Sequence, residues 1–400
     1  MKILQINTYL TGSIGKIAKE IHAFAEPGSS LIAYGKGPSS DNPAFVRFTN
    51  RFFTRTDHLL SRITGLSGVF SVLPTLRLIG LIKQFQPDIV HLHNLHGYYV
   101  NIYMLVRFLT KKKITIVWTL HDEYMYTGNC GSAVPCDKWL SGCGKCPAIH
   151  EYPPSLIFDH SSFLLKKKKK LIAGFEKVVF ITPSKWLANR AKRSILASKK
   201  IETLANGIDC KLFSPRAVEK LKEKHKLSQE KIVLAVAPDL FDGRKGGEFV
   251  LRLAESLKEE AIKFILIGTG KEKITENSNV ILIPKTEDQH QLAAYYSLAD
   301  TFVICSKSEN FPTVCLEALA CGTPVVGFAT GGTAETAPGE LGVFVEYGNL
   351  EQLRKATLHM IGQKKRLTEA CRNYAQTHYS SRLMAQNYFT LYHQSMHNHV

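Results

Sequence analysis

The feature that most limits the possible folds is an alternation of short apolar segments with helix-like segments along the whole chain. Most of the apolar segments are continuous, which is typical of strands buried on both faces of a parallel sheet. Strands that alternate with helices predict doubly wound α/β architecture. The expected strands are residues 2–7, 30–34, 88–93, 114–120, 178–182, 231–237, 264–268, 280–283, 301–305, 324–328 and 343–346, and the expected helices include residues 15–24, 249–257, 290–298 and 313–320.

The number of expected strands favours two sheets, because open sheets usually hold fewer than eleven. A boundary is predicted within Phe213–Gln229, where Pro215 precedes a lysine-rich stretch and then a fresh strand. We therefore expect an N-terminal domain over 1–212 with a cysteine-rich insertion at 123–150, a linker at 213–229, a C-terminal domain over 230–373, and a final helix at 374–400 that packs back on the N-terminal domain.

The densest group of candidate site residues follows the expected strand 301–305. Pro312 suits the start of a helix and Gly322 suits its end. The loop between the strand 301–305 and this helix therefore lies at the carboxyl end of a parallel strand, where open α/β sheets bind ligands. A helix start offers backbone N–H groups to a diphosphate, and the carboxylates of Glu309 and Glu317 can accept hydrogen bonds from ribose hydroxyls. The alternative is that both glutamates are solvated surface acids, because a carboxylate pair alone is a weak signal.

A second candidate donor element is the turn at residues 242–247, which follows the expected strand 231–237. Arg244 and Lys245 can neutralise a leaving diphosphate without a metal ion. The other interpretation is a basic turn on the surface.

The first half offers a candidate acceptor side. Residues 11–16 follow the first strand, and small residues such as Gly15 let a backbone approach a ligand, although a tight turn explains them equally. Several polar side chains at the carboxyl ends of neighbouring strands favour a polar site floor over isolated structural histidines. These residues are His93, Asn94, His96, His121 and Asp122.

Taken together, these segments resemble the retaining glycosyltransferases of family 4. Glu309 and Glu317, with seven residues between them, match that family's donor motif, and residues 331–335 match its glycine-rich turn. The likeness extends to 182–187 and 206–213. It is strongest to the bacterial capsule and colanic-acid type transferases, through residues 91–99 and 118–122.

The resemblance implies a GT-B fold, in which two Rossmann-like domains face each other across a cleft that holds the active site. It implies that Glu317 binds the nucleotide ribose and that Lys245 is the family's phosphate-binding lysine. Leu240 stands where the family usually has an arginine, so whether Arg244 takes over that role is left open. The donor sugar and phosphates would contact Glu309 and the backbone of Asn310, Phe311, Pro312 and Thr313, with Gly15 near the diphosphate.

The resemblance also implies the catalytic groups, which are His121, Glu309 and Lys245. His121 would contact the donor sugar near the reacting carbon, and the acceptor would contact His93, Asn94 and His96. The leaving phosphate itself would help to deprotonate the acceptor hydroxyl, so that neither a metal ion nor another cofactor is needed.

The expected function is retaining hexosyl transfer from a UDP- or GDP-sugar to a lipid-linked or oligosaccharide acceptor in bacterial surface polysaccharide biosynthesis. Two alternatives are weighed against it. One is another enzyme on the same fold, a sugar-nucleotide epimerase or a glycosyl phosphorylase. The other is a non-catalytic scaffold that binds a nucleotide sugar at the membrane.

Four of the nine cysteines, Cys130, Cys136, Cys143 and Cys146, are separated by five, six and two residues. The first apolar run is too short for a signal peptide, and no apolar stretch approaches the roughly 18 residues of a spanning helix. We therefore expect a cytoplasmic chain, in which clustered thiols suggest a structural zinc ion. Reduced thiols and redox-labile disulfides are the alternatives.

The chain is strongly basic, with 51 Lys and Arg against 34 Asp and Glu and a formal charge of +17. A lysine run occupies residues 166–170, and Arg47, Arg51, Arg55 and Arg62 are interspersed with Phe45, Phe48, Phe52 and Phe53. This pattern favours peripheral association with the anionic inner face of the cell membrane. The alternative is that these residues form a solvated helix face without a partner. Nucleic acid is not an expected partner, because no recognised nucleic-acid module is visible.

Overall fold

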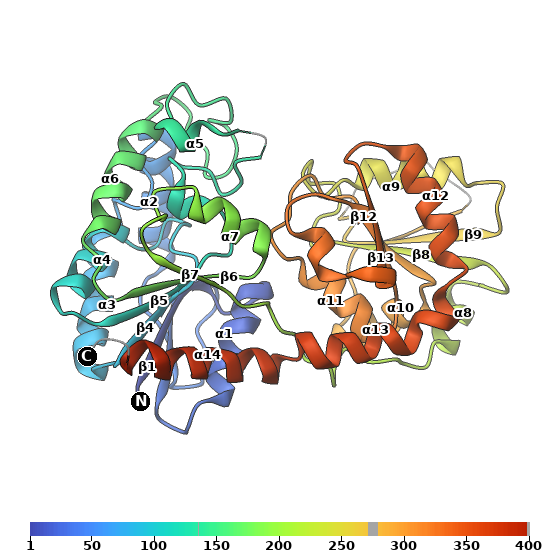
Figure 1. Ribbon diagram of the computed structural model, residues 1–400, viewed down its shortest axis with the longest axis horizontal. Helices are drawn as coiled ribbons and strands as arrows, with labels where there is room; N and C mark the ends of the chain where they lie inside the picture. Colours follow the sequence, from blue (N-terminus) through green and yellow to red (C-terminus); the bar gives the residue numbers. More distant parts are fainter. Residues whose placement is uncertain (135, 271–278, 398–400) are drawn as a thin grey trace. The chain divides into compact units, whose positions relative to one another are not determined.

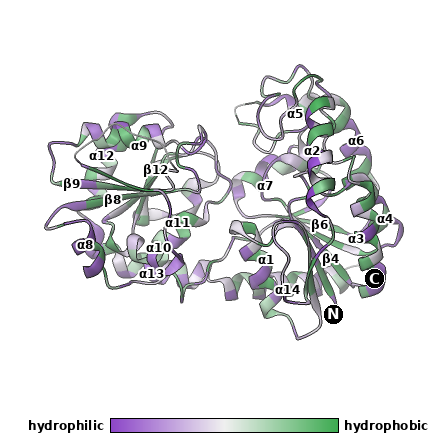
Figure 2. Ribbon diagram, turned by 180° about the vertical axis from the view of Figure 1, so that it is seen from behind, coloured by the Kyte–Doolittle hydropathy of each residue, from purple (hydrophilic) through white to green (hydrophobic). Residues whose placement is uncertain are grey.

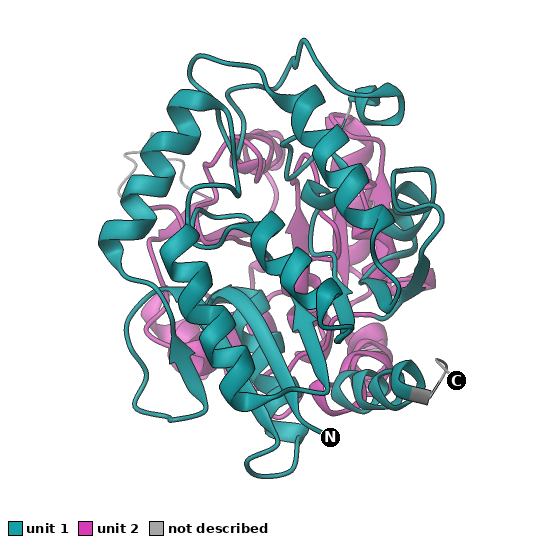
Figure 3. Ribbon diagram, turned by 90° about the vertical axis from the view of Figure 1, so that its left-hand side faces the viewer, with its two compact units in different colours: residues 1–204, 384–400 teal, residues 205–383 magenta. Residues whose placement is uncertain are grey.

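The computed structural model describes residues 1–134, 136–270 and 279–397. The chain forms two units (Figure 3). Unit 1 is Met1–Leu204 with the chain from Met384 onward, and unit 2 is Ala205–Leu383. The segment expected as a linker, residues 213–229, belongs to unit 2 because Phe213 and Leu221 are buried in that unit's core.

Unit 1 is built on a parallel sheet whose strand order, over the described residues, is β3-β2-β1-β4-β5-β6-β7 (Figure 1). Two edge strands were not expected from the sequence. β3 has only three residues, and β7 is polar and largely solvent-exposed, so neither forms an apolar run. The strands are β1 Ile3–Tyr9, β2 Ser30–Lys36, β3 Phe45–Arg47, β4 Ile89–Leu92, β5 Thr115–Thr119, β6 Val178–Thr182 and β7 Lys200–Thr203.

Helices cover both faces of this sheet. One face packs against α1 and α14 through residues such as Ile17 and Leu391, and the other packs against α3, α4, α6 and α7. The helices of unit 1 are α1 Gly12–Phe24, α2 Arg51–Thr64, α3 Val72–Phe85, α4 Ile102–Lys111, α5 Lys138–Ser141, α6 Ser161–Ala173, α7 Lys185–Lys192 and α14 Ser381–His397, with a 3₁₀ turn at Tyr124–Tyr126.

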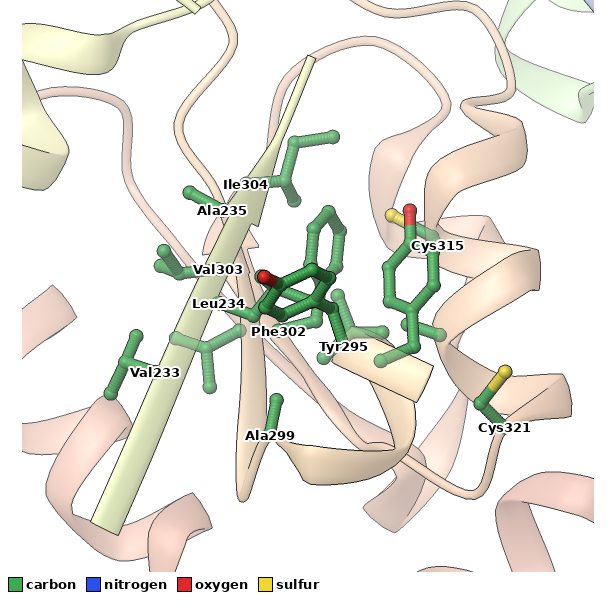
Figure 4. Packing of buried hydrophobic residues seen from close by; sticks show 14 of the residues in the cluster. Val233, Leu234, Ala235, Tyr295, Ala299, Phe302, Val303, Ile304, Cys315 and Cys321 are labelled. Atoms are coloured by element: carbon green, nitrogen blue, oxygen red, sulfur yellow. The ribbon is translucent and has the colours of Figure 1, made fainter. Parts of the chain in front are cut away.

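Unit 2 has a second parallel sheet, of order β10-β9-β8-β11-β12-β13 in the described part of the chain. Its strands are mostly apolar (Figure 2), and Figure 4 shows β8 and β11 residues packing with Tyr295 and Cys315. The strands are β8 Lys231–Val236, β9 Ile262–Ile267, β10 Val280–Ile283, β11 Thr301–Ile304, β12 Val325–Phe328 and β13 Gly342–Val345. The helices are α8 Glu219–Lys224, α9 Gly247–Ser256, α10 Gln289–Leu298, α11 Thr313–Ala320, α12 Leu350–Ile361 and α13 Lys364–Tyr379, with 3₁₀ turns at Thr333–Thr336 and Gly339–Leu341.

The last helix, α14, is tied to the sheet of unit 1 by buried hydrogen bonds. His91 on β4 pairs its Nδ1 with the Tyr392 hydroxyl at 2.6 Å and its Nε2 with Thr119 Oγ1 at 2.8 Å. Thr119 Oγ1 also pairs with the Tyr388 hydroxyl at 2.9 Å. The expected final segment, 374–400, is therefore divided between the end of α13 in unit 2 and α14, which packs on unit 1.

We predict that Tyr392→Phe lowers the free energy of unfolding of unit 1 by about 1–3 kcal/mol, because it leaves the buried Nδ1 of His91 without its partner. All three tryptophans lie within residues 1–204, so tryptophan fluorescence during urea unfolding reports on this unit. The control is Tyr347→Phe, which removes a hydroxyl from a 42% exposed side chain in unit 2. An unchanged unfolding curve for Tyr392→Phe would contradict the anchoring role of this bond.

Candidate active site

In unit 2 the strand order reverses between β8 and β11, and ligands of open α/β sheets bind at such a point beyond the carboxyl ends of the strands. The loop after β8 carries Lys245 and the loop after β11 carries Glu309. Lys245 Nζ lies 2.6 Å from Glu309 Oε1, and the two side chains are 31% and 17% exposed. The structure thus brings two predicted donor residues into one half-buried ion pair.

Two glycines let the loops approach one another. Gly246 has a φ of +74°, and a Cβ there would lie 2.1 Å from the carbonyl oxygen of Cys305. Gly331 has a φ of +60°, and a Cβ there would lie 1.9 Å from the carbonyl oxygen of Glu309, which accepts a hydrogen bond from Gly332 N at 2.9 Å. A side chain at either glycine would force the loops that position Glu309 apart.

The helix that follows Glu309 begins as predicted. Pro312 is the extended N-cap residue of α11, so the helix starts at Thr313 with its first N–H groups at the carboxyl edge of the sheet. Glu317 is 7% exposed, and its Oε2 accepts a hydrogen bond from the Tyr296 hydroxyl at 3.0 Å. The backbone before the helix is held from Asn206, whose Nδ2 donates to Phe311 O at 3.3 Å.

The position at which the family usually has an arginine is part of the core here. Leu240 is 3% exposed, donates its N–H to Gly268 O at 2.8 Å, and accepts a bond from Gly247 N at 3.0 Å. Arg244 is exposed and forms an ion pair with Asp242 at 2.8 Å, which holds the pKa of that carboxyl below its usual value. To bind a donor phosphate, Arg244 would have to exchange this partner, so its predicted role stays a prediction.

In unit 1 the strand order reverses between β1 and β4. Three side chains near this point form a hydrogen-bonded chain. Gln5 on β1 donates from Nε2 to Ala18 O at 2.9 Å, and its Oε1 lies 3.1 Å from His93 Nε2. His93 Nδ1 lies 3.0 Å from His121 Nε2, and the two rings are stacked. His93 follows β4 directly, and His121 follows β5 after Leu120.

The partners in this chain determine which ring nitrogens carry protons. The amide of Gln5 must direct its NH₂ group at Ala18 O, because two oxygens would repel each other, so its Oε1 is the acceptor for His93. His93 Nε2 therefore carries hydrogen, and in the neutral ring Nδ1 is an acceptor. His121 must then donate from Nε2, which leaves Nδ1 of neutral His121 as a hydrogen-bond acceptor.

Both histidines are held neutral at physiological pH. Burial lowers the pKa of His121 to about 4, with His96 adding to the shift and Asp122 opposing it. Burial also lowers the pKa of His93 well below its usual value, and the neighbouring His91 and His121 lower it further. His93 is 1% exposed and both its ring nitrogens are engaged, so its predicted contact with an acceptor would require one of these bonds to break.

His96 lies in a second polar pair. Its Nε2 contacts Asp122 Oδ2, and its Nδ1 lies 3.2 Å from the Tyr152 hydroxyl. Burial tends to raise the pKa of Asp122, but the charge and hydrogen bond of His96 outweigh it, so that the pKa falls below its usual value. The carbonyl oxygen of Asn94 accepts a bond from Thr8 Oγ1 at 3.0 Å. His96, Asn94 and Asp122 are each partly exposed.

Gly15 has a packing role at the start of α1. A Cβ there would lie 2.4 Å from the carbonyl carbon of Leu10 and 2.9 Å from Tyr9 O. The glycine therefore permits the tight turn from β1 into α1, which is the alternative that the sequence left open. Its predicted contact with the donor stays a prediction.

The four clustered cysteines have free thiols and line one small cavity. A hydrogen bond between the thiols of Cys130 and Cys146 lowers the pKa of Cys146 to about 6 and raises the pKa of Cys130. Among the residues that the structure describes, no three His, Cys, Asp or Glu side chains are arranged as a metal site. The loop before Cys130 is fixed by the buried Lys168, whose Nζ donates to Tyr124 O at 2.6 Å and to Thr127 O at 3.1 Å.

Two Rossmann-like parallel sheets, each with polar residues beyond its carboxyl edge, define the GT-B class of glycosyltransferases. Residues 31–212 match the family model "Glycosyltransferase Family 4", and residues 217–378 match "Glycosyl transferases group 1". The chain belongs to the glycosyltransferases of family 4, whose two domains these models describe, and it is a glycosyltransferase. This confirms the resemblance seen in the sequence.

Similar proteins extend over most of the chain. It is 28% identical to the candidate colanic acid biosynthesis glycosyl transferase WcaC of Escherichia coli (strain K12), over 82% of both chains. It is 23% identical to an uncharacterised 41.2 kDa protein in the cps region of Klebsiella pneumoniae, over 98% of this chain and 99% of that one. The Anabaena protein HepE, solved with UDP, has the same fold, with a TM-score of 0.65 at 15% identity over 98% and 99% of the two chains.

The sequence missed several residues that position the site. Gln5 and Tyr296 each hold a predicted residue through one hydrogen bond, and Lys168 holds the loop before the cysteines. A polar glutamine inside the apolar run of β1 was the available signal for Gln5. Lys168 carried no signal, because it lies within a run of five lysines of which the others are not fully buried.

We predict that His93 and His121 are both neutral and protonated on Nε2 at pH 7. Long-range ¹⁵N–¹H spectra of protein labelled in histidine test this, with His93→Asn and His121→Asn as assignment variants. Gln5→Leu removes the acceptor and should mix the two tautomers of His93. A doubly protonated His121 at pH 7 would contradict the assignment.

Proposed function

We propose that the protein transfers a hexosyl group, with retention of configuration, from a UDP- or GDP-sugar to a lipid-linked glycan acceptor in bacterial surface polysaccharide biosynthesis. The observation that carries this proposal is the arrangement in unit 2, where Lys245, Glu309, Glu317 and the start of α11 converge beyond the carboxyl edge of the sheet. A cation, carboxylates and the N-terminus of a helix are together the chemistry that a nucleotide sugar requires.

Different parts of the donor would bind different groups of unit 2. The buried carboxylate of Glu317, held by Tyr296, would accept hydrogen bonds from the ribose hydroxyls. The diphosphate would lie at the start of α11, where the helix dipole favours negative charge. Lys245 would exchange Glu309 for a phosphate oxygen, which would release Glu309 to bind hydroxyls of the donor sugar. These charges would stabilise the leaving diphosphate without a metal ion.

The reacting side would be formed by residues of unit 1. The Nδ1 acceptor of neutral His121 suits a hydrogen bond from a donor-sugar hydroxyl, and Gln5 and His93 would position that ring. His96 and Asn94 would contact the acceptor. In the transfer step, the bond from the anomeric carbon to the phosphate oxygen breaks and the bond to the acceptor oxygen forms on the same face. The acceptor proton passes to the leaving phosphate.

The similar proteins support the biological setting. WcaC is named for colanic acid biosynthesis, and the Klebsiella pneumoniae relative is encoded in a cps region. HepE has been solved with UDP and with UDP-glucose, which favours a uridine diphosphate donor over a guanosine one. We place the enzyme in the cytoplasm at the inner face of the cell membrane, where a lipid-linked acceptor would be presented.

We predict that Glu317→Gln weakens UDP binding by about 1–3 kcal/mol, because it removes the charge from a hydrogen bond to the ribose. Calorimetry with UDP and GDP gives the affinities, and transfer from UDP- and GDP-sugars to extracted membrane lipid gives the activity, with the anomeric configuration read by NMR. Glu340→Gln, at a surface ion pair of unit 2, is the matched control. Binding of no nucleotide sugar would refute the proposal, and binding without transfer would favour a scaffold.

We further propose that Cys130, Cys136, Cys143 and Cys146 hold a structural zinc ion. Their thiols line one cavity, and the loop before Cys130 is pinned by Lys168. Ligation would require the thiols to move closer together than they lie in the described structure. Four thiolates would complete a tetrahedral site with no open position, so the ion would fix the insertion and take no part in the transfer step.

We predict about one zinc ion per chain in protein purified without chelator, because four-thiolate sites bind zinc tightly. Elemental analysis measures the zinc, and thiol titration with and without chelator shows whether the four cysteines are protected. Cys143→Ser should lose the metal, whereas Cys210→Ser, at a half-buried cysteine of unit 2, should retain it. Four reactive thiols without zinc would support the reduced-thiol alternative instead.

A further inference from the structure

Helix α2 has the reverse of the usual arrangement for a helix at the surface of a protein. Its fully buried residues are the polar Asp57 and Ser61. Its exposed residues include Phe52 at 70% and Leu59 at 59%, with Leu60 and Ile63 also exposed. A surface helix normally directs its apolar side chains toward the core, so the outward apolar side of α2 requires an explanation.

The helix is well determined by its own contacts, so its orientation follows from the sequence. Asn50 caps the start by accepting a hydrogen bond from Phe53 N at 3.1 Å, and Gly65 ends the helix with a φ of +69°. Asp57 is satisfied inside, because Ser61 Oγ donates to Oδ1 at 2.8 Å and Ser71 Oγ donates to Oδ2. A different rotation of α2 would bury its apolar side but would break these bonds.

Neighbouring segments extend the apolar side of α2. Leu156 N donates to Arg62 O at 2.7 Å, which places the exposed residues 156–158 against the end of α2. From there Phe158 stacks on His160, whose ring contacts Phe163 on α6. On the other side, the guanidinium of Arg77 on α3 lies 5.4 Å from the ring of Phe53.

These residues form one surface, which we call the apolar face. Its members are exposed large apolar side chains on α2, α3, α6 and the loop between residues 155 and 159. They are Phe52, Leu59, Leu60, Ile63, Val72, Leu73, Leu76, Leu156, Ile157, Phe158 and Phe163. Exposed apolar side chains gathered on segments that contact one another mark an interaction site rather than scattered surface residues.

The charges on the same helices have one sign. The acidic residue of α2, Asp57, is buried, and the sequences of α3 and α6 contain no acidic residue. Basic residues flank the apolar side chains on each helix. They are Arg51, Arg55, Arg62, Arg77, Lys83, Lys166, Lys167, Lys169 and Lys170. An apolar centre with a basic border is complementary to anionic lipid headgroups over acyl chains.

A second copy of this chain fits the surface less well. Dimerisation through the apolar face would bring its arginines and lysines close to the same residues of the partner, and like charges at an interface are repulsive. None of the helices in the described ranges is long and apolar enough to span a bilayer. If the apolar face binds a bilayer, its helices would lie at the membrane surface and would not cross it.

We propose that the apolar face of unit 1 docks on the surface of a bilayer that contains anionic lipids. Phe52, Leu59 and their neighbours enter the headgroup region, while the arginines and lysines bind lipid phosphates. The proposal rests on the proposed function only in that a lipid-linked acceptor would be presented at the same surface.

Flotation of the purified full chain with vesicles tests the proposal. We expect binding to phosphatidylcholine mixed with phosphatidylglycerol, weaker binding to phosphatidylcholine alone, and release by salt because the exposed charges are screened. Leu59→Ser and Phe163→Ser should each reduce the affinity about tenfold, from lost burial of one large apolar side chain. Arg55→Gln should reduce it about fivefold, from the loss of one charge near the surface.

Two control variants distinguish binding through the apolar face from non-specific binding to vesicles. Met396→Ser changes an exposed apolar residue on α14, a helix that covers the opposite face of the sheet, and Lys224→Gln removes an exposed cation of unit 2. Both variants should bind vesicles like the unchanged protein. Circular dichroism verifies that each variant is folded.

Donor binding by calorimetry distinguishes the two proposals. If nucleotide sugars fail to bind but vesicles bind through the apolar face, the docking proposal stands and the proposed function fails. Equal binding to neutral and anionic vesicles, or unchanged binding by the Leu59, Phe163 and Arg55 variants, would overturn the docking proposal. So would a stable dimer in solution that Leu59→Ser converts to monomer.

Discussion

Burial of both faces of each parallel sheet is the constraint on which the rest of this structure depends. Strands such as β4 and β5 have every residue buried and are covered by helices on both sides, so solvent-accessible polar chemistry has no place along them. It is displaced to the loops beyond the carboxyl edge, and there mostly to the points where the strand order reverses. Lys245 and Glu309 meet at that point in unit 2, and Gln5 and His93 meet near it in unit 1.

Polar residues that do lie within the sheet of unit 1 are stabilised because each has a partner, as buried polar groups must. His91 and Thr119 are bonded to two tyrosines of α14, and the ring of His91 lies 4.0 Å from that of His93. A helix almost three hundred residues further along the chain therefore packs directly behind the chain of hydrogen bonds that ends at His121. The local order of the predicted site in unit 1 consequently depends on a segment from the far end of the sequence.

The continuous apolar runs were sufficient to predict doubly wound α/β architecture with two sheets, and α11 was predicted with the bounds that it has. The short edge strands β3 and β7 were missed because an edge strand needs no apolar run. The sequence also grouped the site residues correctly by strand end, but it did not give their partners. Hydrogen bonds between residues distant in sequence, such as Tyr296 with Glu317 or Gln5 with His93, depend on how helices and strands pack, and no local pattern encodes them.

Helix α2 also shows that a local sequence pattern does not determine how an element packs. A pattern of apolar and polar residues at helical spacing indicates that one side of a helix is apolar, but not whether that side faces the core or the solvent. In α2 the orientation matches a few polar bonds, from Ser61 and Ser71 to Asp57, whose loss would leave a buried carboxylate without these partners. Of the four phenylalanines that the sequence interspersed with arginines, Phe52 is exposed, whereas Phe48 is buried in the core of unit 1. The sequence pattern therefore did not show which side chains form the surface, because that depends on the packing around Asp57.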